Sequence, residues 1–232
     1  MRILALESSA AAASAALLTD GVLTAQAYQC AGLTHSRTLM PMCGDMLANC
    51  GIEVRDVDLI AVARGPGSFT GIRIGVAAAR GLAWAAEKPC CGVSTLEAMA
   101  LPLAFEDDAL ICCAMDARRG QIYNALFQAH GGELVRMAPD RAVSLEELGD
   151  ELKNTEKKVL VVGDGANLCY NTLSRTLDGL ELAPEPLRMQ TAFGVALAAM
   201  NEKSRFEPVP NYLRKSQAER EREARLAVKT DN

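Results

Sequence analysis

The loop from Arg64 to Gly75 carries the strongest signal for chemistry in this sequence. It reads Arg-Gly-Pro-Gly-Ser-Phe-Thr-Gly-Ile-Arg-Ile-Gly, and it follows a strand pattern and opens a helical one. Glycine permits positive φ angles, and unpaired N–H groups at a helix start attract anions. No Gly-Lys-Ser/Thr follows, so this is not a Walker loop. Two interpretations stay open: a structural turn, or an anion- or nucleotide-facing loop made by Gly65, Gly67, Ser68 and Thr70.

Other side chains with catalytic potential are poorly placed along the chain. Ser68 and Thr70 have no base nearby in the sequence, which argues against a serine or threonine nucleophile. His35 and His130 are the only histidines, and neither has a second nitrogen ligand nearby or lies near a cysteine cluster, so no metal site is predicted. Asp116 with Arg118 and Arg119 favours an ion pair at a hairpin tip. Residues 163–165, Gly-Asp-Gly, fit either a strand-to-helix turn, which is favoured, or a cradle for adenosine or phosphate.

Two apolar helices flank the glycine loop and are candidates for contact with a partner. The first is expected from Thr34 to Asn49 and the second from Gly71 to Glu87, where small residues recur every fourth position. Such a stripe permits close helix approach, either inside the protein or at a subunit interface. The predicted partner-binding residues are Leu39, Met42, Cys43, Met46, Gly71, Ile72, Gly75, Val76, Ala79 and Ala83.

The order of predicted elements indicates an α/β fold with two lobes. Ile3–Leu6, Ser14–Leu18 and Val22–Gln29 read as three strands joined by turns, an opening that resembles the actin-like ATPase superfamily, with its ribonuclease H-like lobes. Strands are expected again after an acidic, proline-containing stretch at 102–108. We therefore expect an N-terminal, partner-binding lobe at 1–104, a C-terminal lobe at 105–210, and an extended segment with a charged tail at 211–232.

Four blocks of sequence resemble the TsaB (YeaZ) family in order and spacing. They are the Arg64–Gly75 loop, Gly92–Leu96, Asp116–Tyr123 and Pro210–Arg214, and with the Ile3–Ser9 opening they extend over nearly the whole chain. Glu7-Ser8-Ser9 departs from the more usual Asp-Thr-Ser or Asp-Thr-Ala of that family. The resemblance implies a non-catalytic subunit that pairs with a TsaD-type catalytic subunit, recruits a TsaE-type ATPase, and supports threonylcarbamoyl transfer to tRNA adenosine. It also implies a homodimer when the partner is absent.

The resemblance also implies a reason why this chain would have no catalytic activity. The TsaD-type paralogue has a His-x-Glu-x-His metal motif, which falls here on Thr95-Leu96-Glu97-Ala98-Met99, without either histidine. This argues against the alternative of a glycoprotease-like metallopeptidase. A small-molecule kinase or ATPase is the other alternative, but the first turn offers only Glu7 in place of the expected aspartate. No metal is expected as a cofactor, and at most weak binding of ATP or ADP.

Charge and cysteine content narrow the possible partners and compartment. A net charge of −5 argues against strong binding of nucleic acid by the chain alone, so tRNA contact is expected mainly through the complex. The eight cysteines include no Cys-x-x-Cys and read as reduced apolar fillers, which predicts a cytoplasmic protein. No membrane segment is expected. The alternating glutamates and arginines after Lys215 predict a solvated helix or loose tail.

Overall fold

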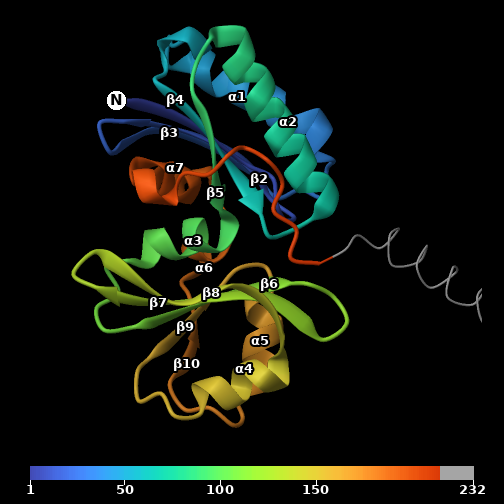
Figure 1. Ribbon diagram of the computed structural model, residues 1–232, viewed down its shortest axis with the longest axis vertical. Coiled ribbons are helices and arrows are strands. Elements are labelled where there is room, and N and C mark those ends of the chain that lie inside the picture. Colours follow the sequence, from blue (N-terminus) through green and yellow to red (C-terminus); the bar gives the residue numbers. More distant parts are fainter. Residues whose placement is uncertain (215–232) are drawn as a thin grey trace, which may run out of the picture.

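The computed structural model describes residues 1–214, and the charged tail predicted after Lys215 lies outside them. Two five-stranded sheets are stacked with helices in five layers (Figure 1). From one end of the molecule to the other, the layers are α1 with α2, the first sheet, α7 with α3, the second sheet, and α4 with α5.

The first sheet has the strand order β3-β2-β1-β4-β5. The hairpins β1–β2–β3 are antiparallel, whereas β4 and β5 run parallel to β1. The second sheet repeats this order as β8-β7-β6-β9-β10, with the same pattern of antiparallel and parallel pairs. One strand topology therefore occurs twice, which confirms the predicted two-lobed, actin-like fold. The strands are β1 (Arg2–Glu7), β2 (Ala13–Thr19), β3 (Val22–Gln29), β4 (Leu59–Gly65), β5 (Cys90–Ser94), β6 (Leu110–Asp116), β7 (Gln121–His130), β8 (Glu133–Ser144), β9 (Val159–Val162) and β10 (Leu180–Leu182).

Helices cover both faces of each sheet because its central strands are apolar throughout. β1 reads Arg-Ile-Leu-Ala-Leu-Glu, and alternate residues pack on opposite sides: Leu4 and Leu6 against α1 and α2, Ile3 and Ala5 against α7. The helices are α1 (His35–Asn49), α2 (Phe69–Ala86), α3 (Thr95–Ala100), α4 (Leu145–Leu152), α5 (Ala166–Leu173), α6 (Glu185–Arg188) and α7 (Ala192–Met200).

Helix α7 returns from the second half of the chain to the first sheet. Its residues Val195, Ala196 and Ala199 are buried with β1, β2 and β4. Gly194 allows α7 to approach α3, because a Cβ there would stand 1.9 Å from the carbonyl oxygen of Ala98. The predicted 105–210 segment is therefore not one lobe by packing: burial of this apolar helix, which only the three-dimensional contacts reveal, joins it to the N-terminal half.

Most predicted elements are present, but the second half holds three that the sequence did not suggest. The turn at 130–132 is followed by the twelve-residue strand β8, and the proline-containing segment 178–190 contains β10 and α6. The strand β8 was missed because only Leu134 and Ala138 of its first half pack inward, while Val135 and Met137 are exposed. Among residues 1–214, no helix has the length and hydrophobicity needed to cross a membrane.

Candidate functional site

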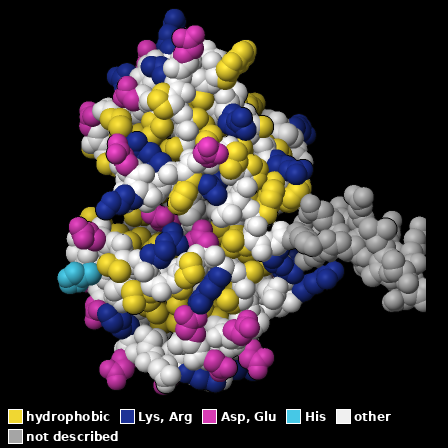
Figure 2. All heavy atoms as spheres, viewed as in Figure 1, with side chains coloured by type: hydrophobic (Ala, Val, Ile, Leu, Met, Phe, Trp, Pro, Cys, Tyr) yellow, Lys and Arg dark blue, Asp and Glu magenta, His cyan; other side chains and the backbone are white. Residues whose placement is uncertain are grey.

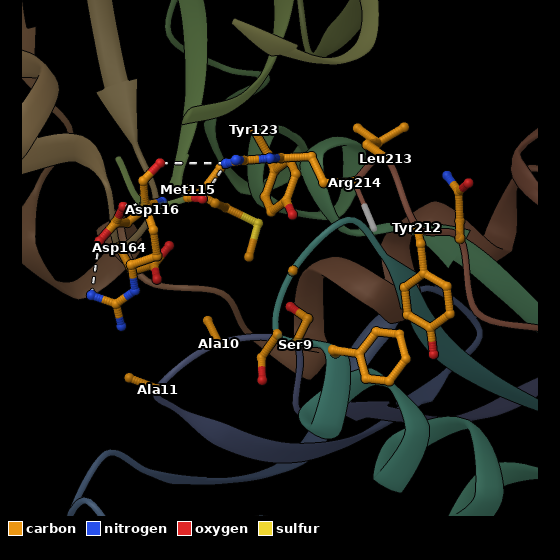
Figure 3. Close-up of a pocket in the computed structure, with 16 residues that line it drawn as sticks. Ser9, Ala10, Ala11, Met115, Asp116, Tyr123, Asp164, Tyr212, Leu213 and Arg214 are labelled. Carbon is orange, nitrogen blue, oxygen red and sulfur yellow. Dashed lines mark hydrogen bonds and ion pairs between the residues drawn. The ribbon is translucent and has the colours of Figure 1, made fainter. Parts of the chain in front are cut away.

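A cleft of about 510 Å³ opens between the two lobes (Figure 3). Its walls come from the turn after β1, the glycine loop before α2, the β6–β7 turn, the loop after β9, and the segment before the tail. The residues that line it are Ser9, Ala10, Ala11, Gly67, Ser68, Phe69, Met115, Asp116, Ala117, Arg118, Tyr123, Asp164, Asn211, Tyr212, Leu213 and Arg214.

The glycine loop is docked directly on the turn after β1. The backbone N–H of Ser68 donates to the Ser9 carbonyl at 2.6 Å, and the Ser8 hydroxyl donates to the Gly71 carbonyl at 2.9 Å. The Ser68 hydroxyl accepts from the Gly71 N–H at 3.3 Å and thereby caps α2. The N–H groups of Ser68 and Gly71, which an anion would use, therefore already form hydrogen bonds within the protein.

Two glycines of this loop are needed for close backbone approach. At Gly67, where φ is 152°, a Cβ would stand 2.4 Å from the Ser9 carbonyl oxygen. At Gly65, where φ is 119°, it would stand 2.4 Å from the Asn211 carbonyl oxygen. Both glycines therefore have a structural role, and only Ser68 and Thr70 of the four predicted anion-facing residues are exposed.

The opposite wall of the cleft carries two carboxylates. Asp116 forms an ion pair with Arg118 at 3.2 Å at the tip of the β6–β7 turn, the pair that the sequence favoured. Asp164 follows β9 and accepts from the Gln190 amide at 3.0 Å, while burial raises the pKa of its carboxyl group. This wall therefore presents acid oxygen atoms to the cleft beside the guanidinium groups of Arg118 and Arg214.

Glu7 does not line the cleft, although the sequence placed it nearest to a phosphate. Its side chain is fully buried, and Oε1 accepts from the Ser9 N–H while Oε2 has no hydrogen-bond partner. Loss of hydration on burial, aided by the nearby charge of Asp164 and opposed by hydrogen bonds from Ser9, raises the pKa of Glu7 to about 7. A carboxylate in this position is poorly suited to hold a metal–phosphate group.

Thr95 and Met99, which occupy the positions of the two missing histidines, lie on α3 between the lobes. They are 0% and 3% exposed, and Met99 packs in the apolar core on the inner face of the second sheet. Its sulfur would be 3.2 Å from a Cβ at Gly163, so it fills the space beside the loop after β9. Within residues 1–214, no three His, Cys, Asp or Glu side chains converge as a metal site would require.

Glu97 lies on the other side of α3, in a polar network that the sequence did not suggest. It accepts from Arg136 at 2.9 Å, and Arg136 also donates to Asp140 at 2.6 Å. Asp140 in turn accepts from the Ser94 hydroxyl at 2.6 Å. The network ties α3 and its cap Ser94 to β8 through hydrogen bonds between residues 39 and 46 positions apart in the sequence.

An aromatic cluster at the mouth of the cleft was also missed. The rings of Phe69 and Tyr212 stack with centroids 4.4 Å apart, and Arg73 lies over Phe69 at 3.9 Å and donates to the Tyr212 hydroxyl at 2.9 Å. The motif containing Tyr212 was visible in the sequence, but its contact with α2, more than a hundred residues away, was not.

The predicted partner-binding residues are almost all internal. Met42 is half-buried, and the other nine are buried against the first sheet: Leu39, Cys43, Met46, Gly71, Ile72, Gly75, Val76, Ala79 and Ala83. A Cβ at Gly71 would stand 2.1 Å from the Ser8 carbonyl oxygen, and one at Gly75 would stand 2.5 Å from the Ser8 hydroxyl oxygen. In the single chain this stripe is therefore internal, because its small residues admit the chain's own turn after β1.

The outer faces of the same two helices are exposed. On α2, Ala77, Gly81 and Ala85 form a second stripe at four-residue spacing, beside Trp84, which is 85% exposed. On α1, Gly44 and Ala48 are exposed near Met40. A Cβ at Gly44 or Gly81 would meet no atom of residues 1–214 within 4 Å, so this surface has room for a close neighbour.

Comparison with known proteins identifies the relatives of this chain. A family model described as TsaD, tRNA N6-adenosine threonylcarbamoyltransferase, matches residues 29–222. The tRNA threonylcarbamoyladenosine biosynthesis protein TsaB of Bacillus subtilis is 34% identical over 94% of this chain and 96% of its own length. The corresponding protein of Haemophilus influenzae is 33% identical over 92% and 94%. The solved structure of YeaZ from Pseudomonas aeruginosa superposes with a TM-score of 0.71 at 27% identity, covering 91% of this chain and 99% of that one.

Proposed function

Because the chain belongs to the TsaB (YeaZ) family of tRNA threonylcarbamoyladenosine biosynthesis proteins, we propose that it is a non-catalytic subunit of a tRNA threonylcarbamoyltransferase complex. Its proposed partners are a TsaD-type catalytic subunit and a TsaE-type ATPase, and a second copy when these are absent. The proposed compartment is the cytoplasm, with which its eight free thiols are compatible.

One observation carries this proposal: the exposed outer face of α1 and α2. A tryptophan that is 85% exposed, next to a stripe of small residues, is costly to leave in water and is typical of an interface. In Figure 1 the two helices lie side by side on the end of the molecule remote from the second lobe. A partner helix pair could therefore dock there without disturbing the cleft.

The features of the cleft favour a non-catalytic, supporting role for this chain over a catalytic one. Ser68 and Gly71 use their N–H groups inside the protein, Glu7 is buried, and Met99 fills space where a paralogue's motif supplies a metal ligand. A subunit of this kind would act by stabilising and orienting its catalytic partner.

Reconstitution with purified components tests the proposal. We expect threonylcarbamoyladenosine to form on tRNA only when this chain, a TsaD-type subunit and a TsaE-type subunit are combined with the threonylcarbamoyl donor and ATP. Undiminished product in the absence of this chain would refute it, as would product formed by this chain alone.

The chain's single tryptophan provides an independent binding signal. Trp84 should emit as a solvated indole in the free protein and shift to shorter wavelength when the TsaD-type subunit is added. An unchanged spectrum with a partner that demonstrably binds would place the interface elsewhere.

A further inference from the structure

The segment 206–214, which we call the strap, crosses the junction between the two lobes and links them. Its Phe206 exchanges two backbone hydrogen bonds of 2.8 Å with Gly92, and its Asn211 N–H donates to the Arg64 carbonyl at 2.7 Å. At its end, Arg214 donates to the Ala117 carbonyl at 2.5 Å, on the β6–β7 turn of the second lobe. The strap is therefore a fixed ribbon across the lobe junction.

Cations without acidic partners are gathered along the strap. Arg64, Arg73, Lys203 and Arg214 contact or adjoin the strap or belong to it, and Arg119 is in the β6–β7 turn to which Arg214 is bonded. None of these five cationic groups forms an ion pair within residues 1–214. Arg64 and Lys203 line a second hollow of about 390 Å³ on one side of the strap, and Arg214 lines the cleft on the other. Among the nearby acids, Asp116 pairs with Arg118, and Glu97 and Asp140 share Arg136, whereas the exposed Glu207 of the strap forms no ion pair in residues 1–214.

Exposed aromatic rings alternate with these cations. Arg64 lies over the ring of Phe206 at 4.8 Å, and Arg73 over Phe69 next to Tyr212. Phe206 is 47% exposed and Tyr212 is 37% exposed. Figure 2 shows Lys and Arg side chains on both lobes of this face, on either side of the lobe junction.

We propose that the strap face, made by these five cations with Phe206 and Tyr212, binds RNA directly. Unpaired guanidinium and ammonium groups attract the phosphates, and the rings offer surfaces on which unstacked bases can lie. The chain's net charge of −5 does not prevent this, because phosphates sense the local field, and the five unpaired cations outnumber Glu207, the one acid of the strap itself. The identification of the RNA as tRNA rests on the proposed function; the RNA-binding surface does not.

The face would contribute a share of the tRNA contacts of the complex. In an acidic chain, five cations support binding that is weak and strongly dependent on salt. The isolated chain should therefore bind tRNA measurably at low ionic strength and lose it as salt is added.

Two double variants of the full chain, which change its net charge by the same amount, test whether the strap face binds RNA. Lys203→Glu with Arg119→Glu alters two strap cations whose side chains make no ion pair or side-chain hydrogen bond in residues 1–214, so the strap itself stays anchored. Arg37→Glu with Arg175→Glu makes the same change in net charge at exposed positions on α1 and beyond the end of α5. Circular dichroism verifies that both variants are folded.

Affinity for an unmodified tRNA transcript, measured by fluorescence anisotropy from low to physiological salt, is the readout. We expect the strap variant to bind about tenfold or more weakly and to lower the slope of log K against log salt by about 1.4 to 1.8, as two lost phosphate contacts predict. The control variant should bind nearly as well as the parent. Equal losses in the two variants, or no binding by the parent at low salt, would overturn the proposal.

A duplex DNA with the same number of phosphates tests the role of the rings. Since paired bases cannot reach Phe206 or Tyr212, tRNA should bind more tightly than the duplex; equal binding would contradict a surface for RNA. These results do not depend on threonylcarbamoyl transfer. If reconstitution succeeds but binding fails, only the strap proposal falls; if the reverse occurs, only the proposed function does.

Discussion

At the scale of single residues, the buried acid Glu7 is the feature with the clearest physical consequence. It lies at the end of β1 with one carboxyl oxygen unpartnered, and burial raises its pKa to about 7. In the unfolded chain the same carboxyl group would ionise near pH 4.5, its ordinary value. Folding therefore binds a proton between these two values, and the stability linked to Glu7 is present below pH 4.5 and lost as the pH rises towards 7.

Glu7→Gln should remove this pH dependence. A neutral amide needs no proton to be buried, so at pH 8 the variant should exceed the parent in free energy of unfolding by up to about 3 kcal/mol, and the difference should shrink towards pH 4.5. Urea unfolding across this range measures it, with the exposed Glu133→Gln as the control. A variant less stable than the parent at pH 8 would mean that the charged carboxylate stabilises the fold.

At the scale of elements, helix α2 has two small-residue stripes with different uses. The inner stripe contains Gly75 and packs on the turn after β1, whereas the outer stripe contains Gly81 and faces solvent. The sequence shows both spacings equally well, since each is a four-residue repeat. Which one is buried depends on how the helix rotates onto the sheet, and Ile72 and Val76 set that rotation by packing with the inner stripe.

A pair of leucine substitutions separates these uses. Gly81→Leu adds a side chain where nothing lies within 4 Å, and leucine is the better helix former, so the free protein should stay folded with a slightly raised melting temperature. Its affinity for the TsaD-type subunit should fall about 5- to 150-fold, from about 1–3 kcal/mol of overpacking at the interface. Sedimentation of the mixture measures the loss.

Gly75→Leu is the matched comparison on the same helix. Its side chain would collide with the Ser8 hydroxyl and with Val62, so the free protein should unfold or melt at a much lower temperature in circular dichroism. A folded Gly81→Leu protein that binds as tightly as the parent would show that the outer face of α2 is not the interface.

At the scale of the whole molecule, the two lobes enclose a cleft that is poorly equipped for nucleotides. The Ser68 N–H on the first lobe is already used by Ser9, the Gly71 N–H is used by the Ser68 hydroxyl, and Glu7 is fully buried. Isothermal titration calorimetry with ATP and Mg²⁺ should therefore give a dissociation constant well above roughly 1 μM, and no ADP should form. A submicromolar constant would show that the lobes rearrange to free the loop, and would reopen an ATP-dependent role for this chain.

The sequence by itself determined which segments form strands and helices in the first half, and the fold class. The apolar runs of β1, β2 and β4 and the Gly/Pro loop are local signals, so their positions could be read before any contact was known. The family resemblance added the lost histidines at Thr95 and Met99. The amphipathic pattern is weak in β8, and this strand was missed because only its pairing with β7 makes it a strand.

Only the tertiary structure decided which faces of the helices and loops are buried. Spacing along a helix shows that residues share a face, but what covers that face depends on distant parts of the chain. The turn after β1 buries Gly71 and Gly75, the return of α7 joins residues 192–200 to the first sheet, and the strap brings Tyr212 to Phe69. Each of these contacts joins segments more than 60 residues apart, and their energies arise from packing and desolvation that no local pattern encodes.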